Sequence, residues 1–123
     1  MFNRYNNEQQ RTAEGAITEY FAAIQFRDEN RLAEALCDDE KAKANNHITS
    51  FYDRLASAGF ELQSLSWIPS QGIPEQGKRH TVTGFADVAA TKGAESFDVE
   101  IGYRVTVEKK LLTWRVCSAE QIS

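Results

Sequence analysis

The chain has 123 residues, of which 41% are hydrophobic and 26% are charged, and its formal net charge is −4. This length suits one domain with a single core, and the composition is typical of a folded chain rather than a disordered one. The acidic balance and the scattered basic residues argue against nucleic-acid binding, because such proteins usually present a basic surface to the phosphates. No apolar run reaches the roughly 18 to 20 residues that span a bilayer, and the polar start of the chain is not a signal peptide.

The first helix is predicted from Asn7 to about Arg27. Apolar residues recur in this segment at the spacing of one buried helix face, and they are Ala13, Ile17, Tyr20, Phe21 and Ile24. Asn7 and Gln10 have the spacing of a capping box, so they mark the expected start of the helix. We expect a single domain over residues 1–123, in which residues 1–6 are disordered or derive from cloning.

Two further helices are predicted after the first. Asp28 can cap a short helix, whose apolar residues are Leu32, Ala35 and Leu36. Asp38 or Asp39 can cap a third helix, and Gly59 is placed to end it in a left-handed conformation. The apolar face of this third helix consists of Ile48, Phe51, Tyr52 and Leu55. Three amphipathic helices need a common surface to cover.

The second half of the chain predicts two strands joined by a loop. Residues 60–68 favour a strand, but their apolar positions change parity along the segment, which indicates a bend or a bulge. Residues 69–78 contain both prolines and two glycines, so we expect a connecting loop. Residues 80–90 predict a second strand, in which Gly84 is a candidate kink.

The clearest signal is the alternation in residues 96–108. Apolar and polar residues alternate strictly there, which predicts a strand with one dry face and one face in water. The pattern continues on a fourth strand through Leu112, Trp114 and Val116. Helices followed by an antiparallel meander indicate an α+β fold, in which three N-terminal helices pack on one face of a four-stranded sheet.

The two cysteines, Cys37 and Cys117, lie at the predicted ends of a helix and of a strand. Two unrelated buried thiols are one interpretation, because free cysteine behaves as a small apolar residue. A disulfide is the other, and it would indicate an oxidising compartment. A regular fourth strand would point Cys117 away from the helices, so a bridge needs a bulge or strand end near Val116, or a path around the sheet edge. No histidine adjoins either cysteine, so a catalytic thiol is not expected.

Acid–base catalysis and metal binding are not expected either. His47 and His80 lack the spacing of a metal site, and we assign both to the surface or to the edge of the core. The carboxylates of the 96–108 strand have the parity of its solvent face, so the interior lacks a predicted general base. We therefore predict no enzyme, no metal and no cofactor.

The aromatic residues on inward-facing positions have two possible roles. They can fill the core, which is the simpler explanation, or they can line a pocket for an apolar ligand. The candidate pocket residues are Tyr20, Tyr52, Trp67, Tyr103 and Trp114.

The segment "AITEYFAAIQFRDENRLAEALC" resembles the nuclear transport factor 2-like superfamily, although Arg27 replaces the glycine usual in its "GD-x-x-x-A-x-x-L" helix. The ending "TWRVC" is similar to small extracytoplasmic domains of actinobacterial membrane-anchored proteins and lipoproteins of unknown function. The resemblance implies a cone with a curved antiparallel sheet around the helices. It also implies a bridge between Cys37 and Cys117.

The expected function is that of a non-catalytic, extracytoplasmic binding or assembly domain, anchored through a segment outside this chain. A protein partner or a small apolar ligand fits this expectation, and a pocket protein for apolar ligands is the alternative, ahead of an isomerase-like or dehydratase-like enzyme. The superfamily also uses its outer sheet face as a dimer surface. Asp98, Glu100, Arg104 and Glu108 place charge on that face, so we expect a monomer or a weak homodimer.

Overall fold

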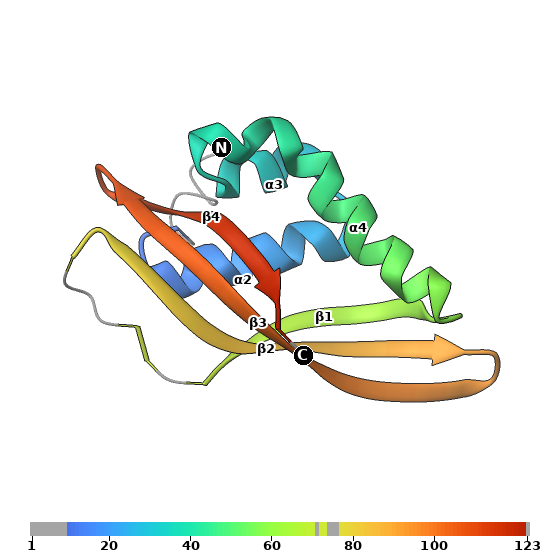
Figure 1. Ribbon diagram of the computed structural model, residues 1–123. Coiled ribbons are helices and arrows are strands. Elements are labelled where there is room, and N and C mark those ends of the chain that lie inside the picture. The colour runs from blue at the N-terminus through green and yellow to red at the C-terminus, as the bar shows by residue number, and fades with distance from the viewer. Residues whose placement is uncertain (1–9, 71, 74–76, 123) are drawn as a thin grey trace.

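The computed structural model describes residues 10–70, 72–73 and 77–122, and its helices lie on one side of a curved sheet (Figure 1). The helical part consists of α2 (Ala13–Gln25), α3 (Glu29–Ala35), the 3-10 helix η1 (Asp38–Lys43) and α4 (Ala44–Ser57). The predictions for residues 1–6 and for Asn7 lie outside the described residues. Within the described part of the chain, no helix has both the length and the apolar character needed to cross a membrane.

The predicted start of the first helix is wrong. Gln10, Arg11 and Thr12 are not helical, and α2 begins at Ala13, where the Thr12 hydroxyl accepts a hydrogen bond of 2.9 Å from the amide of Gly15. Threonine is itself a good N-cap, so the helix needs no earlier one. Gln10 is buried instead of capping the helix. Its amide nitrogen donates to the carbonyl oxygens of Glu34 and Trp114, each at 3.1 Å.

The cap of the second helix is confirmed, because an Asp28 carboxylate oxygen accepts from the amide of Arg31 at 3.0 Å. The third helix differs from its prediction. Residues 38–43 form η1, and α4 begins only at Ala44. The Asp38 carboxylate is engaged elsewhere, since it accepts from Lys110 Nζ at 2.7 Å and from Arg115 Nη1 at 2.9 Å. Gly59 ends α4 with a φ of 84°, as predicted.

The sheet is an antiparallel meander of β1 (Glu61–Pro69), β2 (Arg79–Lys92), β3 (Glu95–Lys110) and β4 (Thr113–Gln121), in that order. The bulge predicted in the first strand is confirmed by a shift of register between Leu62 and Ser64. Gly84, predicted as a kink, lies against the ring of Trp67. An added Cβ there would lie 2.7 Å from the carbonyl oxygen of Ile68, so the sheet needs glycine for a close approach.

The core lies between the helices and the concave face of the sheet (Figure 1). The alternation predicted for the third strand is correct where the helices cover it, since Val105 and Val107 are fully buried. Phe97 and Val99 are 36% and 43% exposed, because the β2–β3 hairpin extends beyond the helices (Figure 1). Leu112 was predicted as a core residue of the last strand. It instead lies in the β3–β4 turn and is 80% exposed.

Cys37 and Cys117 form a disulfide across 80 residues, with their Cα atoms 4.9 Å apart. A regular β4 would point Cys117 away from the helices, but a bulge in β4 allows the bridge to form. Val116 pairs with Val107 and Ser118 pairs with Thr106, so Cys117 is an extra residue without a partner in β3. The amide of Cys37 donates to the carbonyl oxygen of Val116 at 2.9 Å. The residues that follow α3 are therefore attached to the edge strand β4 at its bulge.

Candidate functional site

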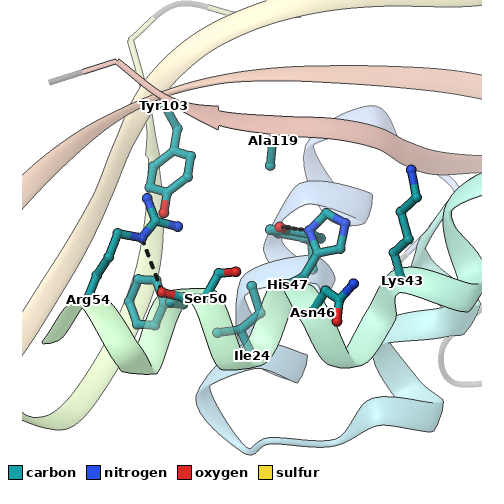
Figure 2. A pocket seen from close by; sticks show the side chains of 10 residues that line it. Ile24, Lys43, Asn46, His47, Ser50, Arg54, Tyr103 and Ala119 are labelled. Atoms are coloured by element: carbon teal, nitrogen blue, oxygen red, sulfur yellow. Dashed lines mark hydrogen bonds between the residues drawn. The ribbon is translucent and has the colours of Figure 1, made fainter. Parts of the chain in front are cut away.

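The candidate site is an open cavity of about 230 Å³ between α4, α2 and the last two strands (Figure 2). Its walls combine apolar side chains with groups that form hydrogen bonds. The lining residues are Tyr20, Ile24, Lys43, Asn46, His47, Ser50, Phe51, Arg54, Tyr103 and Ala119. None of these ten residues is an aspartate or a glutamate.

One polar stripe along α4 supplies most of the hydrogen-bonding groups. Lys43 precedes the helix, and His47, Ser50 and Arg54 follow at steps of four, three and four residues. These steps place side chains on one helix face, and this face borders the cavity beside the buried stripe of Ile48 and Phe51. A single helix thus presents a row of polar groups to the sheet.

A chain of hydrogen bonds links two lining residues of the cavity, Tyr20 and His47, to Glu40. The Tyr20 hydroxyl lies 2.7 Å from Nδ1 of His47, and His47 Nε2 lies 3.4 Å from a carboxylate oxygen of Glu40. A carboxylate only accepts, so in a neutral imidazole Nε2 would carry the proton and Nδ1 would accept the proton of Tyr20. Lys43 lies 3.2 Å from the other Glu40 oxygen. Both nitrogens of the ring are therefore engaged by protein groups.

The two tyrosines of the cavity are held in the neutral form. Tyr20 and Tyr103 are 3% and 4% exposed, and this burial raises the pKa of both phenols. The nearby phenol of Tyr103 further raises the pKa of Tyr20, whereas the charge of Arg54 lowers the pKa of both phenols. Tyr103 therefore offers an O–H donor at the cavity wall at any physiological pH.

Arg54 lines the cavity, and its guanidinium lies next to the phenol of Tyr103 (Figure 2). Its Nε donates to the carbonyl oxygen of Ser50 at 3.2 Å, and its Nη1 donates to the side-chain oxygen of Gln121. Among the described residues, Arg54 Nη2 makes no hydrogen bond, and no carboxylate forms an ion pair with the guanidinium. Two neutral oxygen atoms therefore hold the guanidinium in place, and no described carboxylate neutralises its positive charge.

A second cavity of about 200 Å³ also borders Arg54. It shares Phe51 and Arg54 with the first cavity. Its other lining residues are mostly apolar, namely Leu55, Ala58, Phe60, Val88, Ala90, Val99, Ile101 and Gln121. The apolar lining of the second cavity, which includes residues of the β2–β3 hairpin, thus reaches Arg54 of the first cavity.

The five aromatic residues proposed for a pocket divide into two groups. Tyr20 and Tyr103 line the first cavity, where both contact Phe21 edge-on. Trp67 stacks on Phe21 within the core, with ring centres 5.6 Å apart.

Tyr52 and Trp114 lie elsewhere. The Tyr52 hydroxyl donates to the carbonyl oxygen of Gln25 at 2.7 Å, under the guanidinium of Arg27. Trp114 is buried against the ring of His80, and it borders a separate hollow with Ile73. These two residues and Trp67 pack elsewhere in the structure and do not line the first cavity.

His47 and Arg54 are among the cavity residues that the sequence interpretation missed. His47 was assigned to the surface or the core edge, and it is indeed at the edge of the core, but it also borders the cavity. The polar stripe of α4 was the available signal, because its spacing matches that of the apolar stripe beside it. Across residues 10–70, 72–73 and 77–122, no three His, Cys, Asp or Glu side chains are grouped to hold a metal ion.

No model of a known protein family matches this chain, and no curated protein matches its sequence. Several solved structures are similar in fold. One is a putative calcium/calmodulin-dependent protein kinase type II association domain from Thiobacillus denitrificans. It is 19% identical with a TM-score of 0.59, over 91% of this chain and 96% of that one.

Two further structures have the same fold. A ketosteroid isomerase-like protein from Erwinia carotovora atroseptica is 15% identical, with a TM-score of 0.57 over 95% of this chain and 98% of its own. A SEC-C motif containing protein from Rhodopseudomonas palustris is 15% identical, with a TM-score of 0.57 over 99% and 86%. At these identities the likeness shows the fold alone, which is the nuclear transport factor 2-like α+β cone predicted from the sequence.

Proposed function

We propose that this chain is a binding domain, and that it takes a small molecule into the cavity between α4 and the sheet. The observation that carries this proposal is the open cavity itself, in which hydrogen-bonding groups of Tyr20, Tyr103 and α4 converge over apolar walls. Ligand sites are typically concave and mostly apolar, with a few polar groups that fix the ligand's orientation. At about 230 Å³ the cavity is smaller than the roughly 300 to 1,000 Å³ typical of drug-sized ligands, which favours a small one.

The proposal includes no catalytic step. His47 is the titratable side chain nearest to the role of a general base, but its two nitrogens face Tyr20 and Glu40. A general base must reach the proton that it removes, and both positions on this ring are occupied. The buried phenol of Tyr20 is likewise committed to the imidazole. This arrangement favours binding over proton transfer.

The test is a screen of small molecules against isotope-labelled protein, followed by two-dimensional NMR. We expect some compounds to shift the amide signals of residues that line the cavity. Ala119→Phe fills the cavity from β4 and should abolish these shifts. Ser118→Phe adds the same side chain to the exposed neighbour on the other face of β4, so it should leave binding intact. Loss of binding in both variants, or no binding to the unmodified protein, would contradict the proposal.

We further propose that the domain acts outside the cytoplasm, as the resemblance to extracytoplasmic domains of actinobacterial membrane-anchored proteins implies. The disulfide between Cys37 and Cys117 supports this location, because disulfides persist mainly in oxidising compartments. Protein isolated from its own cells without reductant should show no titratable thiol after denaturation. Two titratable thiols in such a preparation would contradict the proposed location.

A further inference from the structure

The ligand class can be inferred from the two adjoining cavities. We propose that the site binds a medium-chain carboxylic acid as its anion, with the carboxylate beside Arg54 and Tyr103 and the alkyl chain in the neighbouring apolar cavity. This inference rests on the proposed binding function and specifies its ligand.

The charge of the first cavity favours an anion. Lys43 and Arg54 border it, and none of its ten lining residues is acidic. Lys43 is paired with Glu40, so its charge is largely offset. Arg54 is the cation available to a ligand, since its two hydrogen bonds go to neutral oxygens of Ser50 and Gln121. These two bonds also fix the guanidinium, which reduces the entropy lost when an anion binds.

The hydrogen bonds place the carboxylate at the Tyr103 end of the cavity. With a neutral His47 ring, the Tyr20 hydroxyl donates its proton to Nδ1, so it presents only lone pairs to a ligand and would repel a carboxylate. The Tyr103 hydroxyl makes no hydrogen bond to another described residue, and it lies next to the guanidinium in Figure 2. A carboxylate there can accept from the phenol and from Nη2 of Arg54 together, and such charge-assisted bonds are the strong ones.

The second cavity accounts for the alkyl chain. Because it shares Phe51 and Arg54 with the first cavity, a molecule anchored at Arg54 borders both. Its walls include Leu55, Phe60 and Val99, and they offer an alkyl chain apolar contact. Each methylene group that is buried strengthens binding by about fourfold. An acid with a short chain would leave this surface exposed, which is why we specify a medium chain.

The experiment compares three probes by calorimetry and by NMR: octanoate, 1-octanol and butyrate. We expect octanoate to bind with shifts at both cavities. Octanol should bind at least about tenfold more weakly, because it lacks the charge-assisted hydrogen bonds. Butyrate should also bind at least about tenfold more weakly, because its shorter chain leaves the apolar cavity open.

Two variants separate the contributions of head and chain. Arg54→Gln should weaken octanoate about tenfold or more and leave octanol unchanged, because it removes the charge. Val99→Trp narrows the apolar cavity from an exposed position and should weaken octanoate but not butyrate. Arg104→Gln is the matched control, since it removes an exposed arginine on β3 that does not line either cavity. The NMR spectrum of each variant reports whether it folds.

The outcomes distinguish this inference from the function on which it rests. Equal affinity for octanol and octanoate, or no effect of Arg54→Gln on octanoate, would overturn the carboxylate ligand. If neither octanoate nor octanol binds while other small molecules shift the cavity residues, the ligand class is wrong and the binding function stands. If no small molecule shifts the cavity residues, both proposals fail.

Discussion

Tyr103 links the chemistry of the cavity to the stability of the protein. This side chain of β3 is buried, and its ring packs edge-on against that of Phe21, with ring centres 5.3 Å apart. Burial raises the pKa of this phenol and of Tyr20 above the usual value. In the unfolded chain both phenols return to a pKa of about 10. The folded and unfolded states therefore release their tyrosine protons at different pH.

This difference predicts a loss of stability at alkaline pH. The contribution of each phenol is fully present below about pH 10 and is lost as pH rises toward the pKa of the folded state. In that range each phenol lowers the free energy of unfolding by up to about 1.4 kcal/mol per pH unit. Tyr103→Phe should make the dependence on pH shallower, by at most this amount. Urea unfolding at several pH values above about pH 9 measures it, and identical slopes for the two proteins would contradict it.

At the scale of elements, a buried ion pair joins α2 and α3. Glu19 on α2 is 2% exposed, and both of its carboxylate oxygens accept from the guanidinium of Arg31 on α3. A carboxylate in such a place depends on its partner, because it has lost most of its hydration. Helix α3 is short, so its position relies on contacts of this kind rather than on its own propensity.

Removing one partner should therefore cost more than removing both. Arg31→Met should lower the free energy of unfolding by about 3 to 5 kcal/mol, because it leaves the carboxylate buried and unpaired. Glu19→Met combined with Arg31→Met should recover most of that loss, since two apolar side chains can pack against each other. Urea unfolding of wild type, both single variants and the double variant completes the cycle. A double variant no more stable than Arg31→Met would contradict this account.

Local signals predicted the elements well, whereas tertiary contacts set several of their ends. Asp28 and Gly59 act within one turn of their helix, so their roles could be predicted from sequence. The start of α2 could not, because Gln10 is held by carbonyl groups of distant residues. The same holds for Asp38, whose carboxylate binds side chains near the end of the chain instead of capping a long helix.

The candidate site was predictable only in part for the same reason. Tyr20 and Tyr103 follow the apolar periodicity of their elements, which identifies them as inward-facing. His47 and Arg54 become cavity residues only because α4 stands away from β4 at this end of the cone (Figure 2). Sequence periodicity gives the face of a helix but not its distance from a sheet. The polar side chains of α4 border a cavity only because of that distance.

At the scale of the whole molecule, the disulfide joins the helical half to the last strand. Without it, the unfolded chain could separate Cys37 and Cys117 freely, so the bridge stabilises the fold by restricting the unfolded state. For a loop of this length, reduction should lower the free energy of unfolding by up to about 4 kcal/mol. Urea unfolding with and without reductant measures the change. Cys37→Ser with Cys117→Ser is the control, because reductant should then have no effect; equal stability of the oxidised and reduced wild type would contradict the prediction.

The extra residue in β4 also has a consequence for how such a protein can change by insertion or deletion. Because of the bulge at Cys117, Val105 pairs with Ala119 and Tyr103 pairs with Gln121. Deleting Cys117 would leave this pairing in place, because Val116 and Ser118 already pair with the adjacent residues Val107 and Thr106. Ala119 and Gln121 would therefore keep their partners and their face of the strand. A single codon lost at this point would thus remove the bridge but keep the cavity wall at Ala119 and the acceptor of Arg54 at Gln121, so the bridge and the cavity can be inherited separately.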